Sequence, residues 1–153
     1  MVEQTTYLAA PPDRVWQEVQ RPALLRFVAA PLIRFRAVDP SVWPDIWPEG
    51  PHVVSMWLLG GLPLGRQVID ISRPATSGSE RVLRDNGHSA SIRRWDHHLV
   101  VAPEGEGTLY TDRVEIDARW RTPVVAAFAK SFYAHRQRRW QALVAADFDY
   151  DAA

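Results

Sequence analysis

A long amphipathic segment follows the last strand-like segment of the chain, and it decides how the preceding sheet can be buried. Residues 122–146 carry apolar side chains at helical spacing and begin with Thr-Pro, a pair typical of a helix start. Between residues 32 and 118, several segments alternate apolar and polar side chains as half-buried strands do. Such a sheet cannot bury its apolar face alone, and only the terminal helix is large enough to cover it. The order therefore predicts an α+β fold, in which a curved antiparallel sheet grips the C-terminal helix.

Turn residues divide the rest of the chain into about six to seven strands and two short helices. The helices follow the first strand, beginning near Pro12 and at Pro22, and Pro31 ends the second. Asn86-Gly87 is a typical hairpin pair, so we expect a turn there. We find no repeat or linker and expect one domain over residues 1–153. The predicted strands cover residues 3–9, 32–38, 52–59, 64–73, 80–85, 89–101 and 108–118.

The composition excludes several classes of protein. Eighteen basic residues balance eighteen acidic ones, so nothing in the overall charge favours nucleic acid. Cysteine is absent, which excludes disulfides, thiolate metal sites and a cysteine nucleophile and suits the cytoplasm. The first residues do not read as a signal peptide, and no apolar run approaches the ~20 residues that span a bilayer. We therefore expect a cytoplasmic protein with no stable membrane insertion.

Two strand segments carry an imidazole and a carboxylate on their apolar faces. In RWDHHLVV, residues 94–101, neighbouring side chains point to opposite faces, so His97 and His98 cannot enter one site. If Val101 pairs with Thr108 across the following turn, His97 lies directly opposite Asp112. We therefore expect a His97–Asp112 pair on the concave face. The other inward side chains of these strands are Trp95, Leu99, Tyr110 and Val114.

The C-terminal helix brings a positive charge to the same region, since Arg136 lies in its apolar stripe. A guanidinium on a buried face needs a partner, and Asp112 is the first candidate, with Glu115 and Asp70 as others. Its planar fork could instead hold a ligand carboxylate or phosphate. Gln67, on the apolar face of residues 64–73, adds an amide beside Ile69 and Ile71. The stripe consists of Val125, Phe128, Ala129, Phe132, Tyr133, Trp140 and Leu143.

The chain resembles the SRPBCC superfamily, the START-like and pollen-allergen-like helix-grip proteins that include polyketide cyclases and dehydrases. The resemblance lies in the order of elements and in YLAAPPDRVWQEV, LLGGLPLGRQVI, GTLYTDRVEI and the long C-terminal helix, and it covers nearly the whole chain. It implies a hydrophobic cavity between that helix and the concave sheet face. Members bind lipids, hormones or polyketides, and a minority are enzymes.

Our first hypothesis is a protein that binds a small hydrophobic or amphipathic molecule in this cavity, as a monomer or homodimer and without a cofactor. Trp43, Trp47 and Trp57 could form its lid and wall, or equally fill the core. The expected ligand-binding residues are Gln67, Ile69, Ile71, Trp95, His97, Leu99, Tyr110, Asp112, Phe128, Phe132 and Arg136.

Other functions stay open at this point. A cyclase or dehydratase would use His97 as general acid or base, oriented by Asp112, with Arg136 stabilising an oxyanion. A structural or interaction role without a ligand would need an exposed apolar patch. We expect no metal site, because Asp96 and His98 share an outward face with nothing to complete a ligand set. We also expect no nucleic-acid partner, because the basic run 135–139 spreads around its helix.

Overall fold

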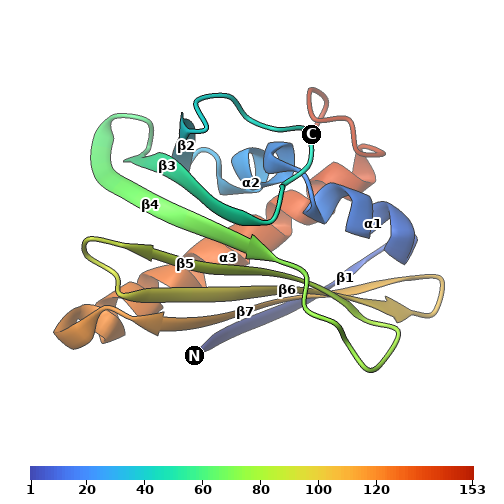
Figure 1. The fold of residues 1–153 in the computed structure, drawn as a ribbon. Helices are drawn as coiled ribbons and strands as arrows, with labels where there is room; N and C mark the ends of the chain where they lie inside the picture. Colours follow the sequence, from blue (N-terminus) through green and yellow to red (C-terminus); the bar gives the residue numbers. More distant parts are fainter.

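The computed structural model describes all 153 residues and has seven antiparallel strands in one curved sheet, with a long helix across its concave face (Figure 1). The strand order is β1-β7-β6-β5-β4-β3-β2, so the first strand pairs with the last. The predicted fold class is confirmed. The strands are β1 (Val2–Leu8), β2 (Ile33–Asp39), β3 (Gly50–Leu58), β4 (Leu62–Ser72), β5 (Arg81–Ser89), β6 (Arg94–Glu104) and β7 (Gly107–Asp117). The helices are α1 (Pro12–Val19), α2 (Pro22–Ala29), the short 3-10 turn η1 (Arg119–Arg121) and α3 (Thr122–Ala145).

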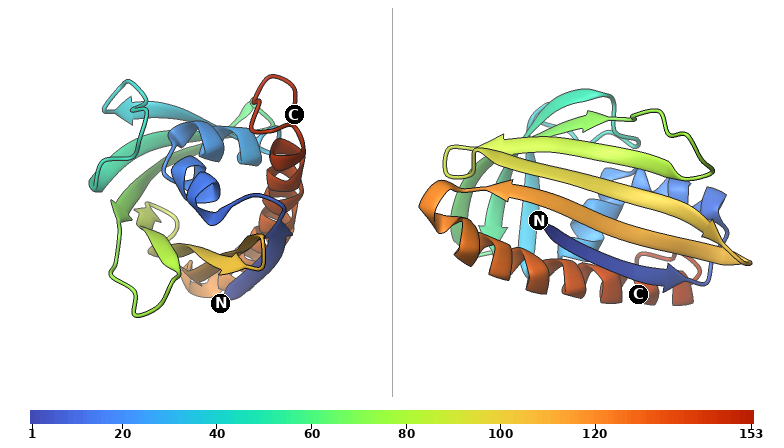
Figure 2. Two further views of the ribbon diagram at one scale, coloured as in Figure 1. Left: turned by 90° about the vertical axis from the view of Figure 1, so that its right-hand side faces the viewer. Right: turned by 90° about the horizontal axis from the view of Figure 1, so that it is seen from below.

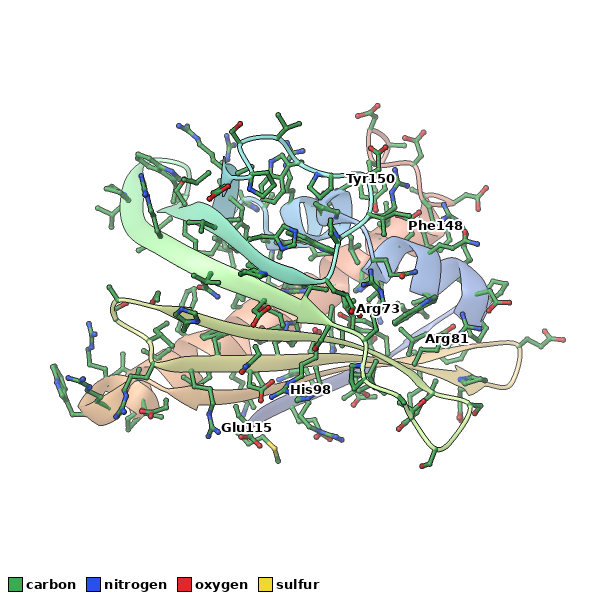
Figure 3. All side chains as sticks on the ribbon, viewed as in Figure 1. Arg73, Arg81, His98, Glu115, Phe148 and Tyr150 are labelled. Atoms are coloured by element: carbon green, nitrogen blue, oxygen red, sulfur yellow. The ribbon has the colours of Figure 1, made fainter.

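The sheet curls around the helices, as the end-on view in Figure 2 shows. α3 packs mainly against β1, β7 and α2, while α1 and α2 lie within the curve of the sheet. The C-terminal segment, which carries Phe148 and Tyr150 (Figure 3), folds back onto them. Tyr150 donates a hydrogen bond to Glu18, and the Arg14 guanidinium lies over the Phe148 ring. No helix of the protein combines the length and apolar character needed to cross a bilayer.

The predicted turn at Asn86-Gly87 is wrong. β5 continues through both residues to Ser89, and the chain reverses at residues 90–93 instead. Gly87 is needed inside the sheet, because a Cβ there would lie 2.7 Å from the Val68 carbonyl oxygen. The close backbone approach, rather than a turn, explains this glycine.

The predicted register between β6 and β7 is wrong by two residues. His97 lies opposite Val114, and Asp112 lies opposite Leu99. The strands run on to a tight turn at Gly105, whose φ of 58° is easy only for glycine. Since a slip of two keeps every side chain on its face, the predicted inward faces are confirmed. The His97–Asp112 contact is confirmed too, as a diagonal pair.

The start of α3 also differs from the expectation. Thr122 does not cap the helix: it is the first helical residue, and its hydroxyl accepts a hydrogen bond from Ala118 N and donates one to Arg119 O. The hydroxyl therefore fixes the turn η1 against the helix.

Candidate functional site

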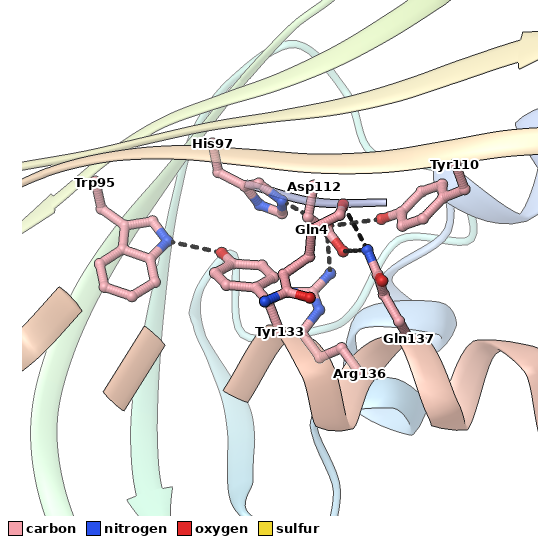
Figure 4. A network of polar contacts seen from close by, with 8 residues as sticks. All are labelled: Gln4, Trp95, His97, Tyr110, Asp112, Tyr133, Arg136 and Gln137. Carbon is pink, nitrogen blue, oxygen red and sulfur yellow. Dashed lines mark hydrogen bonds and ion pairs between the residues drawn. The ribbon is translucent and has the colours of Figure 1, made fainter. Parts of the chain in front are cut away.

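Asp112 is the centre of a buried polar network on the concave face (Figure 4). Its Oδ1 accepts hydrogen bonds from His97 Nε2 at 2.8 Å and from the Tyr110 hydroxyl at 2.9 Å. Its Oδ2 accepts a longer one, 3.4 Å, from Gln137 Nε2, which also donates to the Gln4 carbonyl. Side chains from β6, β7 and α3 therefore meet at one carboxylate that is 1% exposed, and Gln137 links it to β1.

The network fixes the charges of its members. Burial acts to raise the pKa of Asp112, but the hydrogen bond from His97 and the charge of Arg136 outweigh it and hold the pKa below its usual value. Burial lowers the pKa of His97, against the opposing effect of Asp112. Asp112 is therefore the anion and His97 a neutral imidazole whose Nε2 carries the proton.

Arg136 is buried but poorly partnered. Its side chain is 5% exposed, and its Nη2 lies 4.0 Å from Asp112 Oδ1, beyond hydrogen-bond distance. Its Nε has no hydrogen-bond partner. The guanidinium carbon lies 5.0 Å from the Tyr133 ring centre and 5.8 Å from that of Phe132. Of the three candidate partners, Asp112 is the one within 4.0 Å of the guanidinium, and Glu115 pairs with Arg94 instead. At least one N–H group of the Arg136 guanidinium, that of Nε, therefore has no acceptor within the protein.

Arg136 is one of the residues that line a cavity of about 60 Å³, which we call the inner chamber. Its polar walls are Arg21, Gln67, Asp85, His97 and Arg136. The apolar part includes three residues that we predicted, Ile69, Ile71 and Leu99. Trp47 also lines it, with Trp43 packed edge-on against that ring, 5.9 Å away.

A second, larger cavity lies toward the start of α3. It measures about 340 Å³ and is lined almost wholly by apolar side chains, among them Trp95, Phe128 and Phe132. We call it the outer chamber. It shares Phe35 and Gln67 with the inner chamber, so the two adjoin at these residues. The apolar outer chamber thus leads to the polar inner chamber, and this arrangement is usual for small-molecule sites.

Three expected residues take other places. Tyr110 and Asp112 line neither chamber, and they act on the inner one through hydrogen bonds and charge. Trp57 lines neither chamber, and the Arg36 guanidinium lies over its ring. Outside the chambers, Asp96 lies on the outward face as predicted but is only 6% exposed, and its two oxygens accept hydrogen bonds from Arg84 Nε and Nη2. No group of three His, Asp or Glu side chains is arranged to hold a metal ion.

Asp85 is a site residue that the sequence did not reveal to us. It lines the inner chamber, and its Oδ1 accepts a hydrogen bond of 2.9 Å from Asp70 N. Burial raises the pKa of Asp85 to about 8, although that hydrogen bond opposes the shift. The alternation Leu83, Asp85, Gly87 could have revealed it, had the turn not been expected there. Near neutral pH, Asp85 is therefore mainly a carboxylic acid that can donate a hydrogen bond.

Asp85 should make the stability of the protein fall as pH rises. A folded-state pKa above the unfolded value means that the folded chain binds the extra proton, so its stabilisation is complete below about pH 4 and lost through about pH 8. Asp85→Asn keeps the acceptor for Asp70 N without the charge. We expect its melting temperature to exceed that of the wild type by about 5 °C or more above pH 8, and to match it near pH 4. If the melting temperatures of the wild type and Asp85→Asn differ by the same amount at every pH from 4 to 9, the raised pKa of Asp85 is contradicted.

Comparisons with known proteins agree with the fold. A family model described as Domain of unknown function (DUF8410) matches residues 6–144. No curated protein matches the sequence. A START superfamily protein from Mycobacterium smegmatis superposes with a TM-score of 0.60 at 15% identity, over 94% of this chain and 95% of that one.

Two further structures share the architecture. DynU16, from the dynemicin biosynthetic locus, gives a TM-score of 0.57 at 15% identity over 94% of this chain and 46% of that one. Ara h 8.0201 gives 0.53 at 10% identity over 90% and 95%. The chain therefore has the START-like helix-grip fold, as the sequence resemblance implied. These identities establish the fold alone.

Proposed function

Since the chain belongs to the DUF8410 family, whose description assigns no activity, we propose from the site itself that it binds a small amphipathic molecule in the two adjoining chambers. The apolar body of the ligand occupies the outer chamber, and its polar head enters the inner one. The observation that carries this proposal is Arg136, a buried guanidinium that lies beyond hydrogen-bond distance of its nearest carboxylate and lines the polar inner chamber next to an apolar cavity. The fold agrees with this, since proteins of this architecture generally bind hydrophobic ligands.

The inner chamber favours a head group that accepts hydrogen bonds. Arg136 donates, and Asp85 donates while it is protonated, while the Gln67 amide can do either. The charges of Arg136 and Asp112 balance each other, so a neutral carbonyl fits as well as a carboxylate. A cationic head would meet the guanidinium, and only ionisation of Asp85, which is mainly protonated near neutral pH, could compensate it. The proposed ligand class is therefore amphipathic ketones, aldehydes and carboxylic acids. The proposed place of binding is the cytoplasm.

Three probes with the same chain length test this head-group preference. Decanoate and 2-decanone should raise the melting temperature and bind with a negative heat-capacity change, because they bury apolar surface. Decyltrimethylammonium should bind about tenfold more weakly or worse. Calorimetric titration gives the three affinities. Equal affinity for all three would show that the inner chamber does not select the head, and no binding of any would refute the proposal.

A substitution between the chambers tests the location. Gln67→Phe places a ring where the chambers adjoin and removes the amide, so we expect the affinity for decanoate to fall about tenfold or more. Val68→Phe adds the same bulk on the opposite face of β4 and is the matched control. If both variants bind decanoate as the wild type does, the ligand lies elsewhere.

A further inference from the structure

The end of the molecule at which the outer chamber lies exposes an unusual set of large apolar side chains. Trp120 is 85% exposed, Val124 74% and Leu59 66%, with Leu62, Leu64 and Phe128 also exposed. We call these six residues the mouth patch. Leu64, Val124 and Phe128 also line the outer chamber, so the patch is continuous with it. Monomeric proteins rarely expose such a cluster without a use for it.

Three separate segments build this end, and hydrogen bonds join two of them, the β5–β6 turn and the segment at η1. The three segments are the β3–β4 hairpin, residues 58–64, the β5–β6 turn, residues 90–93, and residues 118–124 at η1 (Figures 1 and 2). Arg121 Nη2 donates to Ser91 O, and Arg93 N donates to Asp117 O. Leu59 has a φ of 49° at the hairpin tip, where Asn or Gly is preferred. A leucine kept in that conformation points to a use for its side chain.

The charge around the mouth patch is mainly positive, with Asp117, whose Oδ1 accepts a hydrogen bond from Arg119 N, as the adjoining acid. The three segments contain Arg93, Arg119 and Arg121, all exposed, and no acidic residue. Arg34 reaches the hairpin, with its Cδ 3.1 Å from the position of a Cβ on Gly60. At the opposite end, the β6–β7 turn and the segment 146–153 contain five acids and no base, namely Glu104, Glu106, Asp147, Asp149 and Asp151. Acidic side chains thus gather at the end opposite the mouth patch, although the Arg14 guanidinium also lies there over Phe148.

We propose that the mouth patch docks on the surface of an anionic lipid bilayer, with Trp120 and the exposed leucines in the headgroup layer and the arginines on lipid phosphates. Apolar side chains ringed by arginines match the two layers of such a surface. A second copy fits less well, because a two-fold interface through this face would set arginines against arginines. The docking proposal depends only on the exposed side chains at this end of the protein and not on ligand binding. Combined with the proposed function, it lets a ligand enter the outer chamber directly from the bilayer.

Vesicle co-sedimentation tests the docking. We expect binding to phosphatidylcholine vesicles that contain phosphatidylserine, weak binding to phosphatidylcholine alone, and loss of binding in high salt. Arg119→Gln/Arg121→Gln and, separately, Trp120→Ala should each weaken binding about tenfold or more. Arg26→Gln/Arg138→Gln, which changes two exposed arginines on α2 and α3 outside these segments, is the matched control and should bind as the wild type does.

Three outcomes overturn the proposal. These are no binding to phosphatidylserine vesicles, equal loss in the control and mouth variants, or a dimer that Trp120→Ala dissociates without any vesicle binding. The last result would make the patch an interface between copies. Decanoate titration in solution separates this proposal from the proposed function, since the mouth arginine variants should keep their decanoate affinity. Intact decanoate binding with no vesicle binding refutes the docking alone.

Discussion

Asp112→Asn is expected to lower the free energy of unfolding by about 3–5 kcal/mol, because it leaves the buried Arg136 charge without its anion. It also places an amide NH2 where the carboxylate has its second oxygen, so either Gln137 or the pair of His97 and Tyr110 loses its acceptor. Chemical denaturation at neutral pH measures the loss. Asp96→Asn, on the outer face, is the matched control and should cost less, because the Arg84 charge that it leaves unpaired is 37% exposed to solvent.

The double variant Asp112→Asn/Arg136→Met separates a charge effect from a packing effect. Removing both charges should recover much of the stability that Asp112→Asn loses, since no unpaired ion is then left in the interior. If the two substitutions instead add their costs, or if Asp112→Asn costs under about 1 kcal/mol, Asp112 does not neutralise Arg136.

The second large effect is on binding. Arg136→Met should weaken decanoate binding about 10–100-fold, the contribution expected of a hydrogen bond from a charged donor. It should cost less stability than Asp112→Asn, because Asp112 keeps its donors His97, Tyr110 and Gln137. Arg136→Lys keeps the charge without the planar fork and should recover only part of the affinity.

Arg138→Met is the control for this variant, since Arg138 is exposed on the same helix. Calorimetric titration of decanoate and 2-decanone into the three variants measures the effect. A wild-type affinity in Arg136→Met would place the head group away from the inner chamber.

Periodicity in the sequence predicted the faces of the elements but not their pairing. The stripe on α3 and the alternation in β4, β6 and β7 placed Gln67, His97, Asp112 and Arg136 inward, because one-sided burial imposes a period. The predicted β6–β7 register was wrong by two residues, because a slip of two leaves the burial pattern unchanged.

Three features could be recognised only in the three-dimensional structure. Gly87 looked like a turn residue, although its role is to admit the Val68 carbonyl, and that misreading hid Asp85. Gln137 is buried because α3 is covered on more than one side, by β1 and α2, which widens the buried face beyond the apolar stripe. The mouth patch combines segments that are far apart in the sequence, so no local pattern could reveal it.

The most direct test of the binding site is a crystal structure of the protein with decanoate. We expect the carboxylate within hydrogen-bond distance of Arg136 and beside Asp85, and the chain in the outer chamber against Phe128 and Phe132. An inner chamber filled by its own side chains, with decanoate bound elsewhere or not at all, would contradict the account. The Asp112 network would then be purely structural.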